Sequence, residues 1–359
     1  MNDLWLKDFE KKFGKGVLRD GTEITKPQYR GTGSLALDIA LGGGWGQGRV
    51  VQLMGIEGSG KTLLFDLAAI EAQRVEKKHS CIFDFEGTYD INRFIDLGGD
   101  PTMLKIISHE TIDPMLFLDT AFDIEKYMLT TSADYACYCF DSTGACITSG
   151  EFSKKMEEGQ DAQAPFLTAK CMSEGLKITG GLVLRNETKP TVFFVSQGRD
   201  NMNARSFRGI PVEDKQTGGR ALEFYASQRV KVSRGDTYKG SIEALGLKDI
   251  EVGHVTKVKV KKNKMNGTQG RVAQFDVYNE GLFRGIDRVT ELVTLGVYAR
   301  TIERSGAWYT VFGTRVQGVE AVKDLLSKDA QVFEKLYSET SAALAVMMDG
   351  NKEDDDGEE

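Results

Sequence analysis

The amino-acid sequence predicts an α/β protein whose core is a mixed, largely parallel and twisted sheet with flanking helices. Two observations predict this fold. Short apolar runs of strand length recur at intervals of roughly 30 to 55 residues. The stretches between them have helical character, as in KTLLFDLAAIEAQRVEKK (61–78). The four runs are RVVQLMG (49–55), CIFDFE (81–86), ACYCFD (136–141) and TVFFVSQ (191–197).

The remaining elements follow from the same patterns. Leu6, Phe9 and Phe13 have helical spacing, which predicts a short amphipathic helix over 3–13 that GKG (14–16) ends. Beyond residue 220, three runs with little helix between them predict an antiparallel extension of the sheet. They are RVKVSR (229–234), TKVKVKKNK (256–264) and VAQFDVYN (272–279).

The C-terminal part reads as a small separate α/β lobe. A hairpin is expected around AWYTVFGTRV (307–316), and the helical runs VEAVKDLL and AQVFEKLYSETSAALAV follow it. We therefore expect an N-terminal helix and linker over 1–31, a core over 32–283, a lobe over 284–346 and an acidic, disordered tail over 347–359.

Composition excludes several classes of protein. Hydrophobic residues make up 40% and charged residues 28%, as in ordinary globular proteins, and no apolar run approaches the ~18 residues of a membrane helix. The N-terminus does not resemble a secretory signal. The five cysteines form no CxxC pair and the three histidines are too few for a His-rich metal site, so we expect free thiols in a reducing cytoplasm.

The net charge of −7 is concentrated at one end. Residues 349–359 hold seven acids and one lysine, a net of −6, so the rest of the chain carries only −1. The segment is either a solvated acidic tail or a tail that competes with nucleic acid for a basic groove. Composition does not choose between the two.

The stretch GIEGSGKT (55–62) matches the pattern GxxxxGK[ST]. It follows an apolar run and opens a helix-like segment, as a phosphate-binding loop requires. Lys61 would neutralise the β- and γ-phosphates, and the Thr62 hydroxyl would ligate Mg²⁺. The alternative is a plain strand–turn–helix connection.

Each of the other three runs ends in a polar residue, at the sheet edge where ligands bind in open α/β folds. Glu86 can polarise an attacking water, Asp141 suits a Mg²⁺ carboxylate, and the amide of Gln197 can sense the γ-phosphate. Each alone could be a polar residue where a strand meets solvent. Together with the loop they predict an ATPase site.

Two basic stretches suggest polyanion binding. Residues 198–219 have no hydrophobic period and hold the basic residues Arg199, Arg205, Arg208 and Lys215, with Met202 and Phe207 interleaved. They fit a DNA-binding loop or an ordinary surface loop. In TKVKVKKNK, strand alternation puts Lys262 and Lys264 on one face, which fits either a solvated edge strand or contact with phosphates of a neighbouring subunit.

These stretches closely resemble the bacterial RecA recombinase family over nearly the whole chain. Matching segments are FEKKFGKG (9–16), GTGSLALDIALGGG (31–44), GIEGSGKT (55–62), FDFEGTYD (83–90), YCFDS (138–142), TGGRALEFYAS (217–227), VKVKKNK (258–264) and SGAWY (305–309). The resemblance implies a P-loop ATPase that uses ATP and Mg²⁺, polymerises on single-stranded DNA, pairs with homologous double-stranded DNA and exchanges strands. It implies a cytoplasmic, nucleoid-associated protein without membrane contact.

The resemblance also implies residue roles. The catalytic positions are Lys61, Glu86, Gln197, Lys262 and Lys264, the last two reaching the ATP of the adjacent subunit. The nucleotide positions are Gly55, Glu57, Gly58, Ser59, Gly60, Lys61, Thr62, Leu63, Asp90, Arg93, Asp141 and Ser142, with Mg²⁺ at Thr62 and Asp141. The DNA positions are Lys170, Lys177, Arg199, Met202, Arg205, Arg208, Gly218, Gly219 and Arg220. The subunit-interface positions are Phe9, Phe13, Phe224, Arg229, Lys262 and Lys264.

The chain departs from the family in places. Arg93 stands where the family has an aromatic side chain that stacks on the adenine base. The first DNA-binding loop, expected over about 150–166, shares little with the family. The second loop, 198–219, keeps Arg199 and Gly218–Gly219. Two other functions fit the same core: a ring helicase or translocase, and an ATP-gated coat protein for single-stranded DNA.

Overall fold

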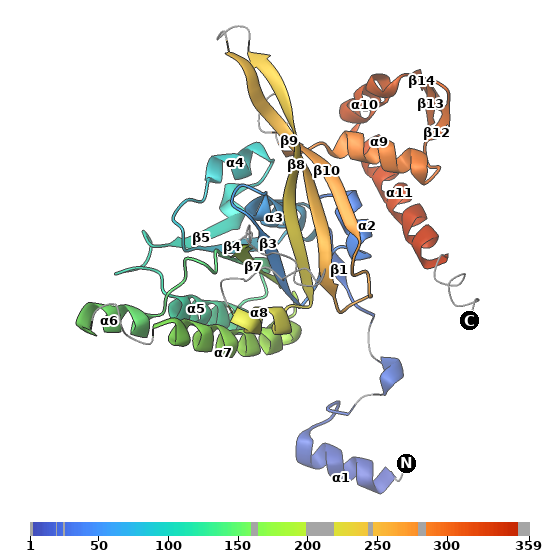
Figure 1. Ribbon diagram of the computed structural model, residues 1–359. Coiled ribbons are helices and arrows are strands. Elements are labelled where there is room, and N and C mark those ends of the chain that lie inside the picture. The colour runs from blue at the N-terminus through green and yellow to red at the C-terminus, as the bar shows by residue number, and fades with distance from the viewer. Residues whose placement is uncertain are drawn as a thin grey trace, which may run out of the picture.

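A computed structural model describes residues 3–18, 20–23, 26–158, 164–198, 219–242, 247–278 and 285–350. Its centre is a nine-stranded sheet with the order β11-β10-β9-β8-β3-β7-β6-β4-β5 (Figure 1). The strands from β8 to β5 in this order pair in parallel, and those from β8 to β11 pair antiparallel. The mixed, largely parallel sheet and its antiparallel extension are therefore confirmed.

The predicted apolar runs all form strands of this sheet. The strands are β3 (Val50–Gly55), β4 (His79–Asp84), β5 (Leu104–Ser108), β6 (Tyr135–Asp141), β7 (Thr191–Gln197), β8 (Gln228–Ile242), β9 (Leu247–Asn263), β10 (Val272–Tyr278) and β11 (Gly285–Ile286). The sequence did not predict β5. It is a short edge strand that contains the exposed Lys105, so its apolar pattern is weak.

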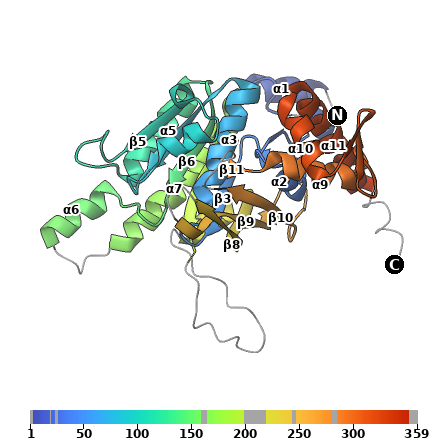
Figure 2. The same cartoon turned by 90° about the horizontal axis from the view of Figure 1, so that it is seen from above.

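Helices cover both faces of the sheet (Figures 1 and 2). The helices described before the lobe are α1 (Asp3–Phe13), α2 (Leu35–Leu41), α3 (Lys61–Glu76), α4 (Ile91–Asp96), α5 (Leu118–Thr131), α6 (Ser149–Glu158), α7 (Ala164–Arg185) and α8 (Gly219–Tyr225), with 3-10 turns η1 (Gly21–Glu23) and η2 (Pro101–Met103). On β7, Phe193 packs into the core with α2 and α3, whereas Phe194 packs with α5 and α7. Because both faces are buried, the central parallel strands are largely apolar on both sides.

The C-terminal lobe has its own sheet and core. It contains α9 (Arg288–Tyr298), β12 (Glu303–Ser305), β13 (Trp308–Val311), β14 (Thr314–Gln317), α10 (Val319–Lys328) and α11 (Ala330–Gly350). Leu35 of α2 belongs to the lobe's hydrophobic cluster. The Glu291 carboxylate of α9 accepts hydrogen bonds from the amides of Leu35 (2.8 Å) and Ala36 (3.1 Å), so it caps the N-terminus of α2 and ties the lobe to the core.

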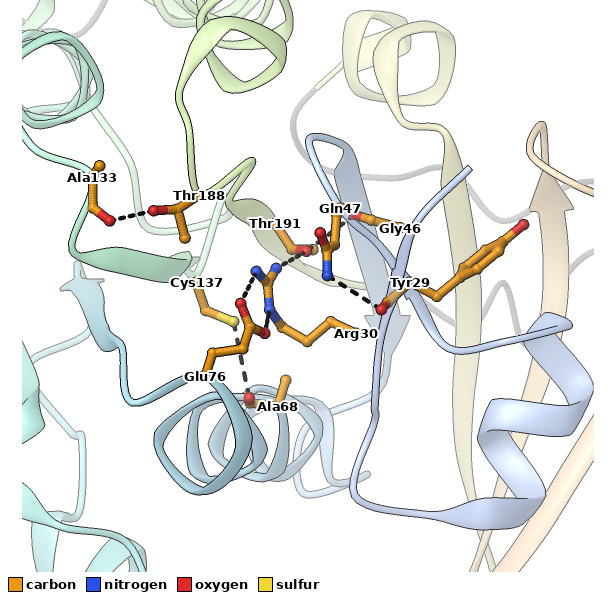
Figure 3. A network of polar contacts seen from close by, with 10 residues as sticks. All are labelled: Tyr29, Arg30, Gly46, Gln47, Ala68, Glu76, Ala133, Cys137, Thr188 and Thr191. Atoms are coloured by element: carbon orange, nitrogen blue, oxygen red, sulfur yellow. Dashed lines mark hydrogen bonds and ion pairs between the residues drawn. The ribbon is translucent and has the colours of Figure 1, made fainter. Parts of the chain in front are cut away.

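The structure moves the boundary between linker and core. We expected residues 1–31 to be an N-terminal helix and linker, but β1 (Tyr29–Arg30) pairs with β2 (Trp45–Gly46). The buried Arg30 guanidinium donates to Glu76 Oε2 (2.8 Å) and to Thr191 Oγ1 (2.8 Å), as Figure 3 shows. These bonds join the chain to the end of α3 and the start of β7. They lie where the parallel strands begin, away from the ends of β3 and β6.

Three further expectations on segment boundaries need correction. β11 pairs with β10, so the core sheet extends past residue 283. We expected residues 347–350 to lie in the tail, but α11 continues through them. The helix formers Ala and Met are frequent in its last turns, up to Met348. Residues 351–359 lie outside the described part. The expected loop over 150–166 is helical at 149–158 and from 164, and Thr148 Oγ1 accepts from the Glu151 amide at the start of α6.

Two general features concern the described residues. None of their helices is both long enough and apolar enough to cross a membrane. All five cysteines are free thiols, and only Cys171 is not fully buried.

Candidate active site

The phosphate-loop pattern lies between β3 and α3, as predicted. β3 ends at Gly55 and α3 begins at Lys61. Gly58 and Gly60 have φ of 68° and 94°, and a Cβ on Gly55 would lie 2.4 Å from the carbonyl oxygen of Val232, so these positions require glycine. Ser59 Oγ is buried and has no hydrogen-bond partner among the described residues. Free amides at a helix N-terminus and an unpaired hydroxyl fit a polyphosphate.

Lys61 and Thr62 place a cation and a hydroxyl at this helix start. Lys61 is almost fully buried and its Nζ donates to the Ile56 carbonyl oxygen (2.6 Å). Burial lowers the pKa of Lys61, and the nearby carboxylates of Asp141 and Glu86 oppose that effect. Thr62 Oγ1 donates to Asp141 Oδ2 (2.7 Å). Burial raises the pKa of Asp141 to about 6, although the Thr62 hydrogen bond lowers it.

The oxygens of Thr62 and Asp141 are the hard ligands that Mg²⁺ prefers. The described residues contain no cluster of three or more His, Cys, Asp or Glu side chains arranged to hold a metal alone. Two protein oxygens fit a Mg²⁺ ion that takes its remaining ligands from phosphate and water.

Glu86 is brought together with residues from two other strands. Its carboxylate accepts a hydrogen bond from the Ser142 hydroxyl, just after β6, and another from Gln197 Nε2 at the end of β7 (3.0 Å). Asp84 fixes the loop that carries Glu86, because its carboxylate accepts from the amides of Glu86, Gly87 and Tyr89. The sequence reasoning did not single out Asp84. Its position at the end of a buried strand was the available signal.

A cavity of about 530 Å³ joins these groups. Of the predicted residues, its walls include Glu57, Gly58, Gly60, Lys61, Thr62, Leu63, Glu86, Asp90, Arg93 and Asp141. Gly55, Ser59, Ser142 and Gln197 are not in its walls. Ser142 and Gln197 instead contact Glu86 from outside it.

On the α4 side, the cavity wall is held by hydrogen bonds between side chains and by an ion pair. Asp90 caps α4, since its side chain accepts from the amides of Asn92 and Arg93. Arg93 Nη2 donates to Asp66 Oδ2 (2.9 Å), and the Tyr89 hydroxyl donates to Asp66 Oδ1 (2.8 Å). The guanidinium of Arg93 is therefore held in the cavity wall by an ion pair.

Several wall residues were not singled out from the sequence, among them Asp66, Arg234, His254 and Tyr278. Asp66 lies one turn after Thr62 on α3, so helical spacing could have identified it. The other three come from β8, β9 and β10, and nothing local in the sequence indicates that these strands reach the cavity.

Lys262 and Lys264 lie outside the cavity, at the C-terminus of α8. Both ammonium groups donate to the Phe224 carbonyl oxygen (3.2 Å each), and Lys264 Nζ lies 5.4 Å from the centre of the Phe224 ring. Partial burial and the charge of Lys264 lower the pKa of Lys262 to about 8. Phe224 itself is 69% exposed.

The other predicted residues lie at separate places. Arg229 has partners in its own chain, Gln52 Oε1 and Glu223 Oε1 (2.7 Å each). Lys170 and Lys177 are exposed on α7. On α1, the rings of Phe9 and Phe13 pack against each other, with 4.8 Å between their centres. Gly219 begins α8, and Arg220 is its second residue. Arg199, Met202, Arg205, Arg208 and Gly218 lie outside the described residues.

Comparison with known proteins decides the family. The family model of the RecA N-terminal domain matches residues 2–283, and that of the RecA C-terminal domain matches residues 290–345. The chain belongs to the RecA family. Proteins named Protein RecA from Clavibacter michiganensis subsp. michiganensis and Arthrobacter sp. are 33% and 34% identical to it, over 96% and 93% of this chain and 89% and 88% of those relatives. Protein RecA from Chloroherpeton thalassium is 32% identical over 98% of this chain and 92% of its own length.

Proposed function

We propose that this RecA-family chain is a DNA-dependent ATPase that polymerises on single-stranded DNA and catalyses homologous pairing and strand exchange in recombination and repair. The observation that carries the proposal is the hydrogen bond from Gln197 to Glu86. Gln197 is the last residue of β7 and directly precedes the proposed DNA-binding loop over 198–219, of which the structure does not describe residues 199–218. A change at the phosphate end of the cavity therefore has a direct covalent route to that loop.

Each residue of the site has a role in this proposal. The backbone of 55–62, with Glu57 and Leu63 beside it, holds the phosphates of ATP, and Lys61 offsets their charge. Thr62 and Asp141 would hold Mg²⁺, which neutralises charge on the phosphates when it is bound. Glu86 orients and polarises the attacking water, while Ser142 and Gln197 hold its carboxylate in place.

The neighbouring subunit completes the site in this proposal. Lys262 and Lys264 are absent from the cavity walls of their own chain, and exposed Phe224 lies beside them. We infer that these lysines reach the ATP of an adjacent copy, with Arg229 supporting α8 at the same interface. Phe9 and Phe13 on α1 would dock on the next copy, which gives a helical filament.

DNA is the proposed partner at the other face of the filament. The basic residues of 199–218, together with Lys170, Lys177 and Arg220, would contact the phosphates of single-stranded or double-stranded DNA. The acidic residues after Gly350 would compete with DNA for these groups. We infer a cytoplasmic protein that joins the nucleoid when it is active.

The proposal is tested by ATP turnover with and without single-stranded DNA, by electron microscopy of the same mixtures, and by strand exchange between homologous molecules. We expect strong stimulation by DNA, helical filaments, and loss of all three activities in Lys61→Ala. Full turnover by dispersed single molecules without DNA would refute it. Unwinding of a forked duplex without a homologous partner would indicate a helicase, and filaments without turnover a coat protein.

A further inference from the structure

His254 is a buried side chain whose polar atoms are unused. It lies on β9, opposite Thr237 of β8 and Val277 of β10, and is only 6% exposed. Neither ring nitrogen has a hydrogen-bond partner among the described residues. His109 contrasts with it, since its two ring nitrogens contact the Phe85 carbonyl oxygen (2.9 Å) and the Leu116 amide (3.1 Å). A buried polar group without a partner costs stability, so a partner that the protein alone does not supply is expected.

The imidazole faces the cavity of the candidate active site. Because strand residues alternate, His254 shares a face of β9 with Val258 and Val260, which belong to the core beside α3. At the end of that face the core gives way to the cavity, and His254 is one of its wall residues.

The part of the cavity around His254 suits a flat ring rather than phosphate. In the sheet, β8 separates β9 from β3, which leads into the phosphate loop. The other wall residues here include Leu97, Val277 and Tyr278, and the Tyr278 ring stacks on that of Tyr238 (5.7 Å between centres). Apolar and aromatic walls with a few polar groups are typical of sites for planar ligands.

The charge state of the imidazole fits the same role. Burial lowers the pKa of His254, and the positive charge of Arg234 lowers it further, so the ring is neutral at pH 7. Arg234 itself is paired with Glu251. A neutral imidazole can donate a hydrogen bond from one nitrogen and accept one at the other, and it carries no charge that would attract a phosphate.

We propose that His254 recognises the base of the bound nucleoside triphosphate through a hydrogen bond from one ring nitrogen. This inference rests on the proposed function, because it takes the cavity to be the ATP site. His254 is a specificity-determining residue and not a catalytic one. It acts on the affinity for the nucleoside and leaves the phosphate loop unchanged.

The test compares His254→Leu with the wild-type protein and with the control His79→Leu. Leucine is close in volume and has no polar side-chain atom, so it removes the two unpaired nitrogens. His79 lies at the start of β4, the end of the strand away from the site. Isothermal titration calorimetry measures binding of Mg-ADP and of magnesium tripolyphosphate, which has no base. Thermal unfolding measures the stability of the nucleotide-free proteins.

We expect His254→Leu to bind Mg-ADP roughly 3- to 10-fold more weakly, as for the loss of one hydrogen bond, with tripolyphosphate binding unchanged. Its melting temperature without nucleotide should equal or exceed that of the wild type, because two unpaired polar atoms are gone. His79→Leu should bind both probes as the wild type does.

Three results would overturn the inference. Unchanged Mg-ADP affinity in His254→Leu would show that the ring does not contact the base. A lower melting temperature with equal weakening of both probes would show a structural role. A wild-type protein that binds neither probe would overturn the proposed function as well, whereas the first two results would leave that function standing.

Discussion

The carboxyl group of Glu125 is buried between α5 and α7, behind the strands that carry the site. It is 1% exposed, and Thr179 Oγ1 donates to its Oε2 (2.6 Å). Its other oxygen, like the hydroxyl of the neighbouring Tyr138, has no hydrogen-bond partner among the described residues. Burial raises the pKa of Glu125 from its ordinary value of 4.5 to about 8, although the Thr179 hydrogen bond lowers it. The group is therefore protonated in the folded protein at neutral pH.

This protonation makes the free energy of unfolding depend on pH with a definite sign. Below about pH 4.5 the group is protonated in both the folded and the unfolded chain. Between about pH 4.5 and pH 8 the unfolded chain releases the proton and the folded chain keeps it. Folding then loses stability by about 1.4 kcal/mol per pH unit, which is on the order of 4 kcal/mol between pH 5 and pH 8.

Glu125→Gln isolates this contribution. The amide keeps the shape of the protonated carboxyl and can still accept from Thr179, but it does not titrate. Urea unfolding of both proteins at pH 5, 6, 7 and 8, without nucleotide and at equal protein concentration, gives the difference between their free energies of unfolding. Other buried carboxyl groups, such as Asp38, are common to both proteins and cancel in the difference.

We expect the variant to gain on the order of 4 kcal/mol relative to the wild type from pH 5 to pH 8. The gain should be nearly independent of salt, because a buried group is weakly screened. A difference that stays constant across this pH range would refute the reasoning, since it would mean that the folded protein ionises Glu125 as readily as the unfolded chain does.

Three other changes have expected outcomes. Glu86→Gln should bind ATP and DNA but lower DNA-stimulated turnover by roughly 10²- to 10⁴-fold, the usual contribution of a general base, and wild-type turnover would place the base elsewhere. Arg30→Met leaves the Glu76 carboxylate without its cationic partner and should lower the free energy of unfolding in urea by about 3 kcal/mol. An unchanged urea midpoint would contradict this expectation. Deleting residues 351–359, which hold six acids and one lysine, should strengthen duplex binding in fluorescence anisotropy, most at low salt. Equal affinity with and without them would make the segment a solubility feature.

The sequence by itself determined the class of fold and the part of the cavity formed by the GIEGSGKT loop (55–62) and the ends of the neighbouring strands. Strands β3, β4, β6 and β7 are continuous apolar runs because helices bury both of their faces, so their positions can be read from the residues. Glu86 and Asp141 could be picked out because they lie at or just past the ends of such strands, and Lys61 and Thr62 because they close a glycine-rich loop after one; parallel strands end at one edge of the sheet.

Only the tertiary structure decided the rest of the cavity wall. Arg234, His254 and Tyr278 come from strands whose sequences show ordinary alternation, and only the packing of distant segments places them in the same cavity wall as Arg93 of α4. Likewise, nothing near Arg30 in the sequence indicates Glu76, yet their ion pair sets where the linker ends and the core begins. The physical reason is the same in both cases. Local patterns report which side of an element is buried, whereas the partner of a polar side chain depends on how distant segments pack.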